Sequence, residues 1–447
     1  MNTFKQLLST LRSSFWFMPS LIVVLSIVFA VALIKADSVG SDRWLARWPL
    51  LFGAGAEGAR GMMSTIAGSM MSVVGITFSM TLMTLALASS QYTSRILRNF
   101  MRDRITQVVL GVFAGIFTYC LIVLRTIRGG DEGAFVPGLA VFFGFVLALG
   151  GVYALMFFIH HIASSIQASN VIASVAQETI EAIDRLFPAN LGQGLSEDDD
   201  DHNPFPLAEQ HWRDVPAEKS GYIQNVNNAA LLRLARDRKT IVMMKHGIGD
   251  FVVRDTTLAA LALEEPPDEE TISALRATFI ISRYRTVEQD AAFGIRQIVD
   301  VALKALSPGI LDTTTAVMCV DYLTAILARI AIRQIPSLRR CEEGELRVIA
   351  KGPSFESLLA ESFDQIRSIA KGDVVIMSRM LDAFQTLAGL TAGPHRRQAL
   401  RDQVQWIAEL AGRTVEASHD RARINVQLAL LREMLEDGAC AGDGRTV

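Results

Sequence analysis

The 447-residue chain has little cysteine and no large excess of charge of either sign. Four cysteines form too few disulfide bonds to stabilise a chain of this length, which excludes a disulfide scaffold. A net charge of −3, from 43 basic and 46 acidic residues, gives no sign of a nucleic-acid-binding protein. Half of the residues are hydrophobic and the mean hydropathy is +0.30, so the chain is not disordered, and part of it is expected to lie in lipid.

The chain also lacks the short signatures of common active sites. It contains no HExxH, CxxC, GxSxG, P-loop or protein-kinase signature. The adjacent His160 and His161 would point about 100° apart on a helix, which suits residues at a membrane interface better than metal ligands. We therefore expect no catalytic residues, no metal and no cofactor, and a membrane enzyme of unrecognised type is the least favoured class.

Four uncharged apolar stretches predict membrane-spanning helices. They cover residues 16–34, 61–94, 105–124 and 133–159. A helix needs roughly 20 apolar residues to cross a bilayer, and unbroken runs suit helices, which satisfy their own backbone groups in hydrocarbon. The first stretch has the length of a signal peptide, but no clean cleavage site follows it, so we interpret it as an anchor that stays. The alternative, four core helices of a soluble protein, accounts poorly for four such runs in succession.

The orientation of these helices follows from the density of basic residues. Lysine and arginine are equally frequent on the two sides, but the short loop between the second and third stretches concentrates Arg95, Arg98, Arg102 and Arg104 against one acid, Asp103. Such clusters favour the cytoplasmic side. We expect a four-helix transmembrane domain over residues 1–161 in the bacterial inner membrane, with both termini in the cytoplasm.

The second stretch carries small residues at steps of four and three. This small-residue seam consists of Gly61, Thr65, Gly68, Ser72, Gly75, Ser79 and Ala86. Small residues let membrane helices approach closely and gain van der Waals contact. Two interpretations stay open: the seam packs against another span of the same subunit, or it lines the axis of a homo-oligomer, as in a pore.

The charges of the membrane domain bear on what such a pore could do. No Asp, Glu, Lys or Arg lies inside the four stretches, which argues against a proton-driven pump and leaves passive conduction of ions open. In a ring of subunits, Arg95, Arg98, Arg102 and Arg104 would form a basic cytoplasmic mouth. The alternative is that these arginines bind anionic lipid headgroups.

The second half of the chain returns to amphipathic patterning and predicts an α+β, mostly helical, soluble domain. An extended amphipathic helix is expected over residues 162–190, followed by an acidic and proline-containing linker over residues 191–220. The linker includes an acidic run at 197–201, which is more typical of a solvated loop than of a cation site.

A small α/β module is expected over residues 221–263. Strands are predicted at 221–223, 241–244 and 251–253, with a glycine-rich hairpin turn at 246–250 between the last two. This turn lacks the full G-x-G-x-x-G spacing of a phosphate-binding loop. A helical cytoplasmic domain over residues 264–436 and a disordered tail over residues 437–447 complete the predicted organisation.

One predicted helix start in this domain is a candidate anion site. Asp312, Thr313 and Thr314 follow a Ser-Pro-Gly sequence that ends the preceding helix. The free N–H groups of a helix start can bind an anion. A plain structural cap is the favoured alternative.

Three passages resemble a known family. They are STIAGSMMSVVGITFSMTLMTLALASSQYTSRILRNFMRDR at 64–104, TQVVLGVFAGIFTYCLIVLRTIR at 106–128 and FGIRQIVDVALKALSPG at 293–309. The chain is similar, over nearly its whole length, to the uncharacterised family of bacterial multipass membrane proteins called domain of unknown function 2254. The resemblance implies a multipass membrane domain with a soluble C-terminal portion, and no catalytic residues. The family has Asn-Asp-Pro after this last passage, where the chain has Leu311, Asp312 and Thr313.

These features favour an oligomeric, channel-like permeation protein with a cytoplasmic domain. The expected partners are the lipid bilayer, further copies of the chain and ions, with no nucleic acid. The alternative is a membrane-anchored sensor or scaffold whose soluble half binds a partner.

Overall fold

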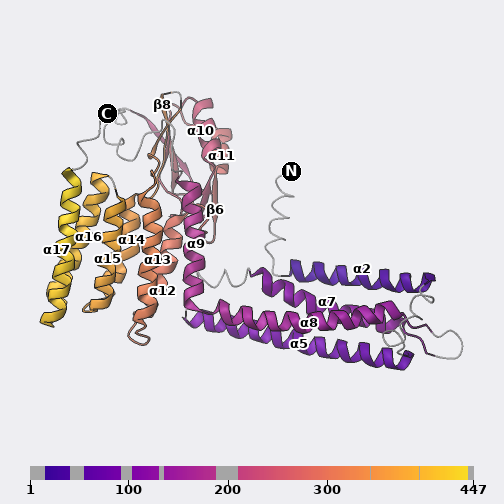
Figure 1. The fold of residues 1–447 in the computed structure, drawn as a ribbon. Helices are drawn as coiled ribbons and strands as arrows, with labels where there is room; N and C mark the ends of the chain where they lie inside the picture. Colours follow the sequence, from indigo (N-terminus) through magenta and orange to yellow (C-terminus); the bar gives the residue numbers. More distant parts are fainter. Residues whose placement is uncertain are drawn as a thin grey trace, which may run out of the picture. The chain divides into compact units, whose positions relative to one another are not determined.

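The computed structural model describes residues 16–40, 55–91, 103–129, 135–187, 210–342, 344–391 and 393–440 (Figure 1). The chain divides into two compact units, Met1–Gln167 and Ala168–Val447, which are described separately below as unit 1 and unit 2. The predicted acidic run at 197–201 and the tail after residue 440 lie outside the described residues.

Unit 1 contains four long apolar helices, at the positions where the sequence predicts spans. They are α2 (Phe17–Gly40), α5 (Ala56–Gln91), α7 (Arg104–Thr126) and α8 (Gly138–Ser165). By length and composition, each could cross a membrane. Helix α7 packs against the other three, and the core of the unit includes the fully buried Met63, Phe113 and Tyr119. The phenol of Tyr119 donates a hydrogen bond to the carbonyl of Ala140 at 2.7 Å.

Two glycines allow α7 to approach α2 closely. A Cβ atom added at Gly111 would lie 2.8 Å from Cδ1 of Ile22 and 2.9 Å from Cα of Pro19. One added at Gly115 would lie 2.5 Å from Oγ of Ser26. These distances are shorter than van der Waals contact, so this GxxxG pair forms the packing surface between the two helices.

The helices of unit 1 extend beyond the uncharged stretches and carry charges at their ends. The carboxylate of Asp37, in the last turns of α2, accepts hydrogen bonds from the N–H groups of Leu139 and Ala140 at 3.2 Å each, and so caps the start of α8. Arg60 of α5 donates to the carbonyl of Ile127 at the end of α7, at 3.1 Å. An acid at a helix N-terminus and a base at a C-terminus satisfy orphan backbone groups and complement the helix dipole. These charged residues lie outside the four uncharged stretches, so the helices are longer than the stretches that predicted them.

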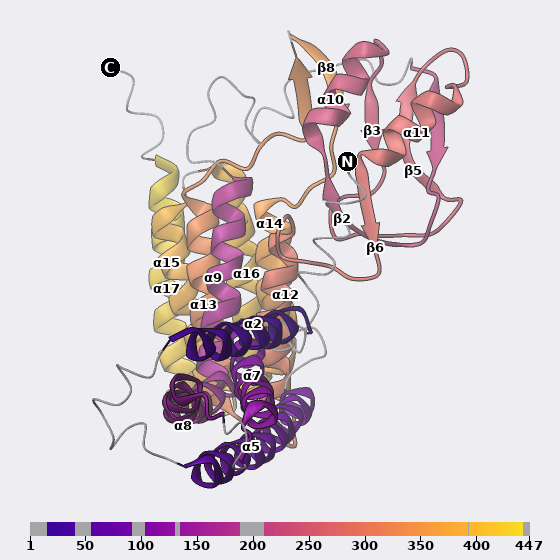
Figure 2. The ribbon, with the colours of Figure 1, turned by 90° about the vertical axis from the view of Figure 1, so that its right-hand side faces the viewer.

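Unit 2 contains two sheets. The five-stranded sheet has the order β1 (Trp212–Pro216), β5 (Thr257–Ala262), β3 (Val242–Met244), β8 (Glu345–Ile349) and β7 (Arg339–Glu342). The three-stranded sheet has the order β4 (Phe251–Val252), β2 (Gly221–Val226) and β6 (Phe279–Ser282). Their common core includes buried side chains of α10 (Asn228–Asp237) and α11 (Glu269–Ala277), which lie beside the strands in Figure 2.

The sheets differ from the predicted module in two ways. Strands β2, β3 and β4 lie where the sequence predicts them, but β3 and β4 belong to different sheets, so the predicted hairpin is wrong. The prediction of helices alone after residue 264 is also wrong, because β6, β7 and β8 complete the sheets and β8 pairs in parallel with β3. Register in a sheet depends on partners distant in sequence, and these partners are not visible in a local pattern.

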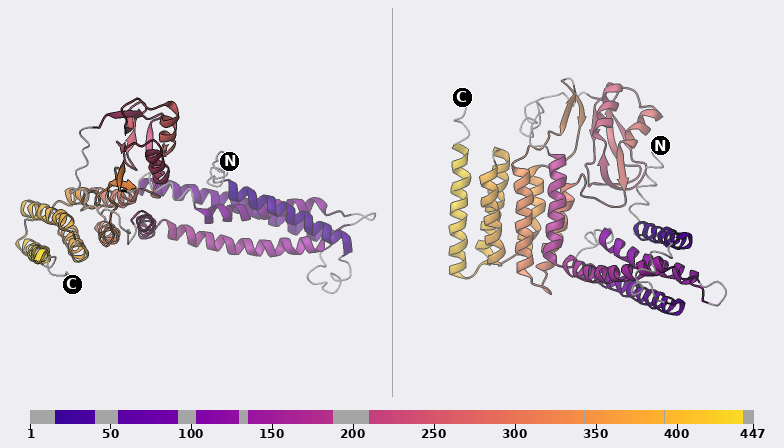
Figure 3. Two further views of the ribbon diagram at one scale, coloured as in Figure 1. Left: turned by 90° about the horizontal axis from the view of Figure 1, so that it is seen from above. Right: turned by 45° about the vertical axis from the view of Figure 1, so that its right-hand side comes forward.

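Seven further helices lie in the described part of unit 2. They are α9 (Ala168–Leu186), α12 (Ala291–Ala305), α13 (Thr313–Ala331), α14 (Phe355–Ile369), α15 (Val374–Leu390), α16 (Pro394–Thr414) and α17 (Ser418–Cys440). They lie side by side as an array (Figures 1 and 3). Helix α8 ends at Ser165 and α9 begins at Ala168, so the helix predicted to extend from the fourth span through residue 190 is two helices.

Helix α13 is a fifth helix that is long and apolar enough to cross a membrane, and it was not among the four predicted spans. Its side chains Leu323, Leu327 and Ile330 are fully buried within unit 2. Its Arg329 pairs with Asp184 of α9 at 2.7 Å.

Candidate functional site

The small-residue seam of α5 faces away from the other described helices of unit 1. All seven of its residues are exposed, and a Cβ added at Gly61, Gly68 or Gly75 would meet no atom within 4 Å. The buried side chains of α5 lie on the opposite face: Ala59, Met63, Ala67, Met70, Thr77 and Thr84. The seam therefore does not pack against α2, α7 or α8, and its surface is available to lipid, another subunit or water.

Two hydroxyl groups of the seam donate hydrogen bonds within α5 itself. Thr65 donates to the carbonyl of Gly61 at 2.8 Å, and Ser72 donates to the carbonyl of Gly68 at 3.1 Å. These bonds to the preceding turn leave neither of the two donors in need of a further partner. The hydroxyl oxygens keep further acceptor capacity, so the same surface tolerates lipid and can also contact water.

At the opposite end of the unit from Asp37, an acid and a histidine join α7 to α8. Asp103 caps α7 by accepting hydrogen bonds from the N–H of Ile105 at 3.1 Å and the hydroxyl of Thr106 at 2.6 Å. Nε2 of His161 lies 2.7 Å from Oδ2 of the same carboxylate, and the ring of Phe157 stacks on His161. Burial alone would raise the pKa of Asp103, but the hydrogen bonds from Thr106 and His161 outweigh burial and hold this pKa below its ordinary value.

This Asp–His pair was not predicted from the sequence, because the two residues are far apart in the chain. His160 is exposed, whereas His161 is half-buried in its contact with Asp103. Arg104, in the first turn of α7, is exposed. Arg95, Arg98 and Arg102 lie outside the described residues, so the basic mouth stays a prediction.

The candidate anion site at the start of α13 is occupied by its own cap. Asp312 accepts hydrogen bonds from the N–H of Thr315 at 3.0 Å and from its hydroxyl at 2.6 Å, and these bonds hold the pKa of Asp312 below its ordinary value. A carboxylate thus already sits where an anion would bind. Thr313 and Thr314 are helical residues of the first turn. The start of α13 is therefore a structural cap formed by Asp312.

The structure explains why Asn and Pro are favourable at the positions where this chain departs from the family sequence. Leu311 has φ +50°, a left-handed conformation that asparagine adopts far more readily than leucine. Thr313 is the first helical residue, where proline is also favourable. The family's Asn and Pro therefore suit the same turn geometry that this chain has.

Replacing Leu311 by asparagine is expected to stabilise unit 2 by about 0.5–1 kcal/mol, because the left-handed conformation costs leucine more. A rise in the thermal unfolding temperature would show this. Ile310→Asn, one residue earlier and without a positive φ, is the matched control and should give no such rise.

The glycine-rich turn at 246–250 is a packing element. Gly249 has φ +89°, and a Cβ there would lie 2.5 Å from Oδ2 of Asp290 and 2.8 Å from Nη2 of Arg285. Asp290 and Arg285 form an ion pair at 2.8 Å, and Asp290 also caps α12 through the N–H of Phe293 at 3.0 Å. The glycine lets the turn lie directly on this pair.

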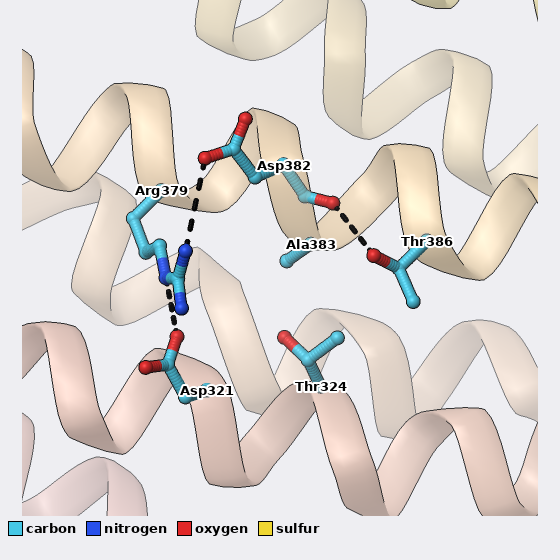
Figure 4. Close-up of a pocket in the computed structure, with 6 residues that line it drawn as sticks. All are labelled: Asp321, Thr324, Arg379, Asp382, Ala383 and Thr386. Carbon is cyan, nitrogen blue, oxygen red and sulfur yellow. Dashed lines mark hydrogen bonds and ion pairs between the residues drawn. The ribbon is translucent and has the colours of Figure 1, made fainter.

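Two pockets lie among the described residues of unit 2. The smaller, of about 160 Å³, lies between α13 and α15 (Figure 4). Arg379 stands between Asp321 and Asp382 there and pairs with both, so each charged side chain that lines this pocket already has a partner of opposite charge. The larger, of about 310 Å³, lies at the ends of β3, β5 and β8, and its lining includes Lys239, Ile241 and Arg347.

Comparisons with known proteins agree with the predicted resemblance. Residues 12–386 match the family described as predicted membrane protein, DUF2254. Uncharacterised proteins of Mycobacterium bovis and of two strains of Mycobacterium tuberculosis are 31% identical over 445 residues, which is 98% of this chain and 83% of each relative. No solved structure matches the chain.

Proposed function

Since the chain belongs to the DUF2254 family of predicted membrane proteins, we propose that α2, α5, α7 and α8 are its membrane spans, with both termini in the cytoplasm. The fifth candidate, α13, is assigned to the soluble part, because its polar residues are matched inside unit 2. Arg329 pairs with Asp184 of α9, and Asp321 pairs with Arg379 of α15. Charged residues in the middle of a true span would be costly.

Reporter fusions test this topology. A fusion after Gly130 should report the outside of the inner membrane, and a fusion after Asn190 should report the cytoplasm. An outside signal at Asn190 would contradict the proposed topology. With an inside signal at Gly130 it would mean four spans of the opposite orientation, and with an outside signal at Gly130 it would mean that α8 does not cross the membrane.

We further propose that the protein is a homo-oligomer with a channel-like permeation path, assembled through the small-residue seam. The observation that carries this proposal is the position of the seam: it lies directly opposite the buried face of α5 and contacts none of the described helices α2, α7 and α8. In lipid, an exposed stripe of glycine and serine gains most from close contact with another helix. The hydroxyl oxygens of the same stripe, which can accept hydrogen bonds from water, also suit a water-filled axis.

Gly75→Leu is expected to weaken assembly strongly, because the added side chain would hold two seams apart. Ser69→Leu is the matched control, since Ser69 is also an exposed small residue of α5 but lies beside the seam. Oligomer size in detergent, measured by light scattering, should fall for the first variant and stay at the wild-type value for the second. Equal assembly of both variants would contradict a seam interface.

Thiol accessibility and ion flux separate a pore from simple packing. With Cys341 and Cys440 replaced by serine, cysteines at Ser72 and Ser79 should react with water-soluble thiol reagents, and one at Phe78 should not. Liposomes containing the wild-type oligomer should pass ions, and those containing Gly75→Leu should not. Unreactive cysteines and no flux from folded oligomers would reduce the seam to a packing surface.

The second candidate function, a membrane-anchored sensor, is favoured by the larger pocket of unit 2. Its volume of about 310 Å³ reaches the size of small-molecule sites, and its lining combines apolar Ile241 and Leu346 with the cations of Lys239 and Arg347. Assembled protein without flux would favour this function over permeation.

A further inference from the structure

Helix α17 lies at one end of the helical array in unit 2. In that array α9, α13, α15 and α17 follow one another in a row, and α12, α14 and α16 pack along them. Helices α13 and α15 have a neighbour in the row on both sides, whereas α17 has α15 on one side and no described helix on the other. Figure 1 shows α17, in yellow, as the outermost helix of the array.

The two faces of α17 differ in burial. The face toward the array is buried and apolar, with Ile424, Leu428, Leu431 and Leu435. The other face has exposed residues at steps of three, four and three, which are Arg423, Val426, Leu430 and Glu433. Val426 is 60% exposed and Leu430 is 57% exposed. This is the spacing at which one helix packs along another. We call these four exposed residues the outer seam of α17.

The helix at the other end of the row has the polar outer face that water favours. Every exposed residue of α9 is polar, among them Ser174, Gln177 and Glu181. A stacked helical array stays soluble when its terminal helices present polar outer faces. Helix α9 meets this condition, whereas α17 presents an apolar pair, Val426 and Leu430. The end of the array at α17 therefore has the composition of a surface that packs against a further helix.

The charges at the two ends of the outer seam are complementary to those of an antiparallel copy. Arg423 and Glu433 are exposed, and neither forms an ion pair with another described residue. Because the two lie equally far from Leu428 in the helix, a two-fold axis at the level of Leu428 places each Arg423 opposite Glu433 of the other copy. The same axis places Val426 opposite Leu430. A parallel pair would instead set arginine against arginine and glutamate against glutamate, which is unfavourable.

We propose that the outer seam of α17 binds a second copy of this chain, as an antiparallel helix pair with Val426 and Leu430 at its centre and Arg423–Glu433 ion pairs at its ends. This interface lies wholly within unit 2 and does not depend on the assembly proposed for the small-residue seam of α5. One helix pair is small beside a standard protein interface of about 1,600 Å². We therefore expect a reversible contact, which cross-linking detects better than a measurement of size.

Disulfide cross-linking of the full-length protein in detergent tests the pairing. With Cys341 and Cys440 replaced by serine, chains carrying Val426→Cys are mixed with differently tagged chains carrying Leu430→Cys and oxidised mildly. The mixed dimer should form several times faster than a dimer of either variant alone, because positions 426 and 430 lie opposite each other only across an antiparallel pair. Asn425→Cys is the control, since Asn425 is also exposed on α17 but points about 100° away from Val426. It should give little covalent dimer with any of the variants.

Charge reversal gives a second readout, which depends on the partner copy. Arg423→Glu, introduced into both chains of the mixed pair, should lower the yield of covalent dimer about tenfold, because like charges would then face each other at both ends. Glu433→Arg should have the same effect. The two changes together should restore the yield, since each ion pair is then present with its members exchanged. Both residues are exposed and unpaired within their own chain, so neither change should alter the thermal unfolding of unit 2.

Four results would overturn the proposal. Faster cross-linking of Val426→Cys alone and of Leu430→Cys alone than of their mixture would mean a parallel pair. Equal yields with Asn425→Cys would mean random collision in the detergent micelle. A doubly charge-reversed protein that does not recover would mean that these charges do not select the partner. Protection of Val426→Cys from a water-soluble maleimide in native membranes, without any covalent dimer on oxidation, would mean that a different protein covers the outer seam.

Discussion

Replacing Gly249 by alanine is expected to destabilise unit 2 by about 3 kcal/mol, the sum of a strained backbone and an overpacked contact. Alanine at φ +89° is strained, and its Cβ would meet the Asp290–Arg285 ion pair at 2.5 and 2.8 Å. Asp290 is almost fully buried and caps α12, so it cannot move aside without leaving helix N–H groups unsatisfied. The melting temperature should fall by roughly 6–12 °C for a unit of this size.

Gly412→Ala is the matched control for this prediction. Gly412 lies inside α16, and a Cβ there would meet no atom within 4 Å. Alanine should stabilise that helix by roughly 0.5–1 kcal/mol, because glycine loses more backbone entropy on folding. If Gly249→Ala melts at the wild-type temperature while Gly412→Ala behaves as expected, the turn does not depend on its contact with the ion pair.

The sequence predicted the positions of the four helices of unit 1 because a bilayer requires long apolar runs. The ends of these helices were harder to predict, because the charged side chains that cap a helix end come from another helix. Asp37 is 102 residues before its partner Leu139 in the chain, and Arg60 is 67 residues before Ile127. A hydropathy pattern excludes such residues from a span, whereas the structure uses them at the ends of the helices.

The small-residue seam shows a different limit of prediction from the sequence. Its heptad spacing establishes that Gly61, Gly68 and Gly75 share one face of α5, but spacing cannot tell what that face contacts. The structure shows that the face is exposed and lies opposite the packed one. The close glycine contacts within unit 1 belong instead to the GxxxG pair of α7.

In unit 2, helices were easier to predict than strands. Helices α14, α15, α16 and α17 follow the 3.6-residue apolar period and begin within the predicted helical domain of residues 264–436. Strand β5 has the sequence TLAALA, which has no alternation because four of its residues are buried. Strands β7 and β8 are short and charged, and their places depend on β3, about one hundred residues earlier. No local pattern reports such a partner.

A fragment of residues 168–447 is expected to fold as a cooperative unit, whereas a fragment of residues 220–447 is not. The shorter fragment lacks α9, whose Val171, Ile172, Val175 and Ile183 are buried against the array. At roughly 1.5–3 kcal/mol for each buried side chain, their loss removes about 6–12 kcal/mol. Since domains are stable by only about 5–15 kcal/mol, the remaining array should not hold its native packing.

A third fragment, of residues 210–447, separates the effect of losing α9 from the effect of losing β1, since the fragment of residues 220–447 lacks both. It keeps β1, which pairs with β5, but still lacks α9. We expect it to melt without a cooperative transition, like the shortest fragment, because the exposed array surface is the larger defect. Adding Gly294→Leu to the longest fragment should have a similar effect, since any side chain at position 294 would overlap Thr179 of α9. A cooperative melt of residues 220–447 at the temperature of residues 168–447 would show that α9 is a tether to the membrane and not part of the folded unit.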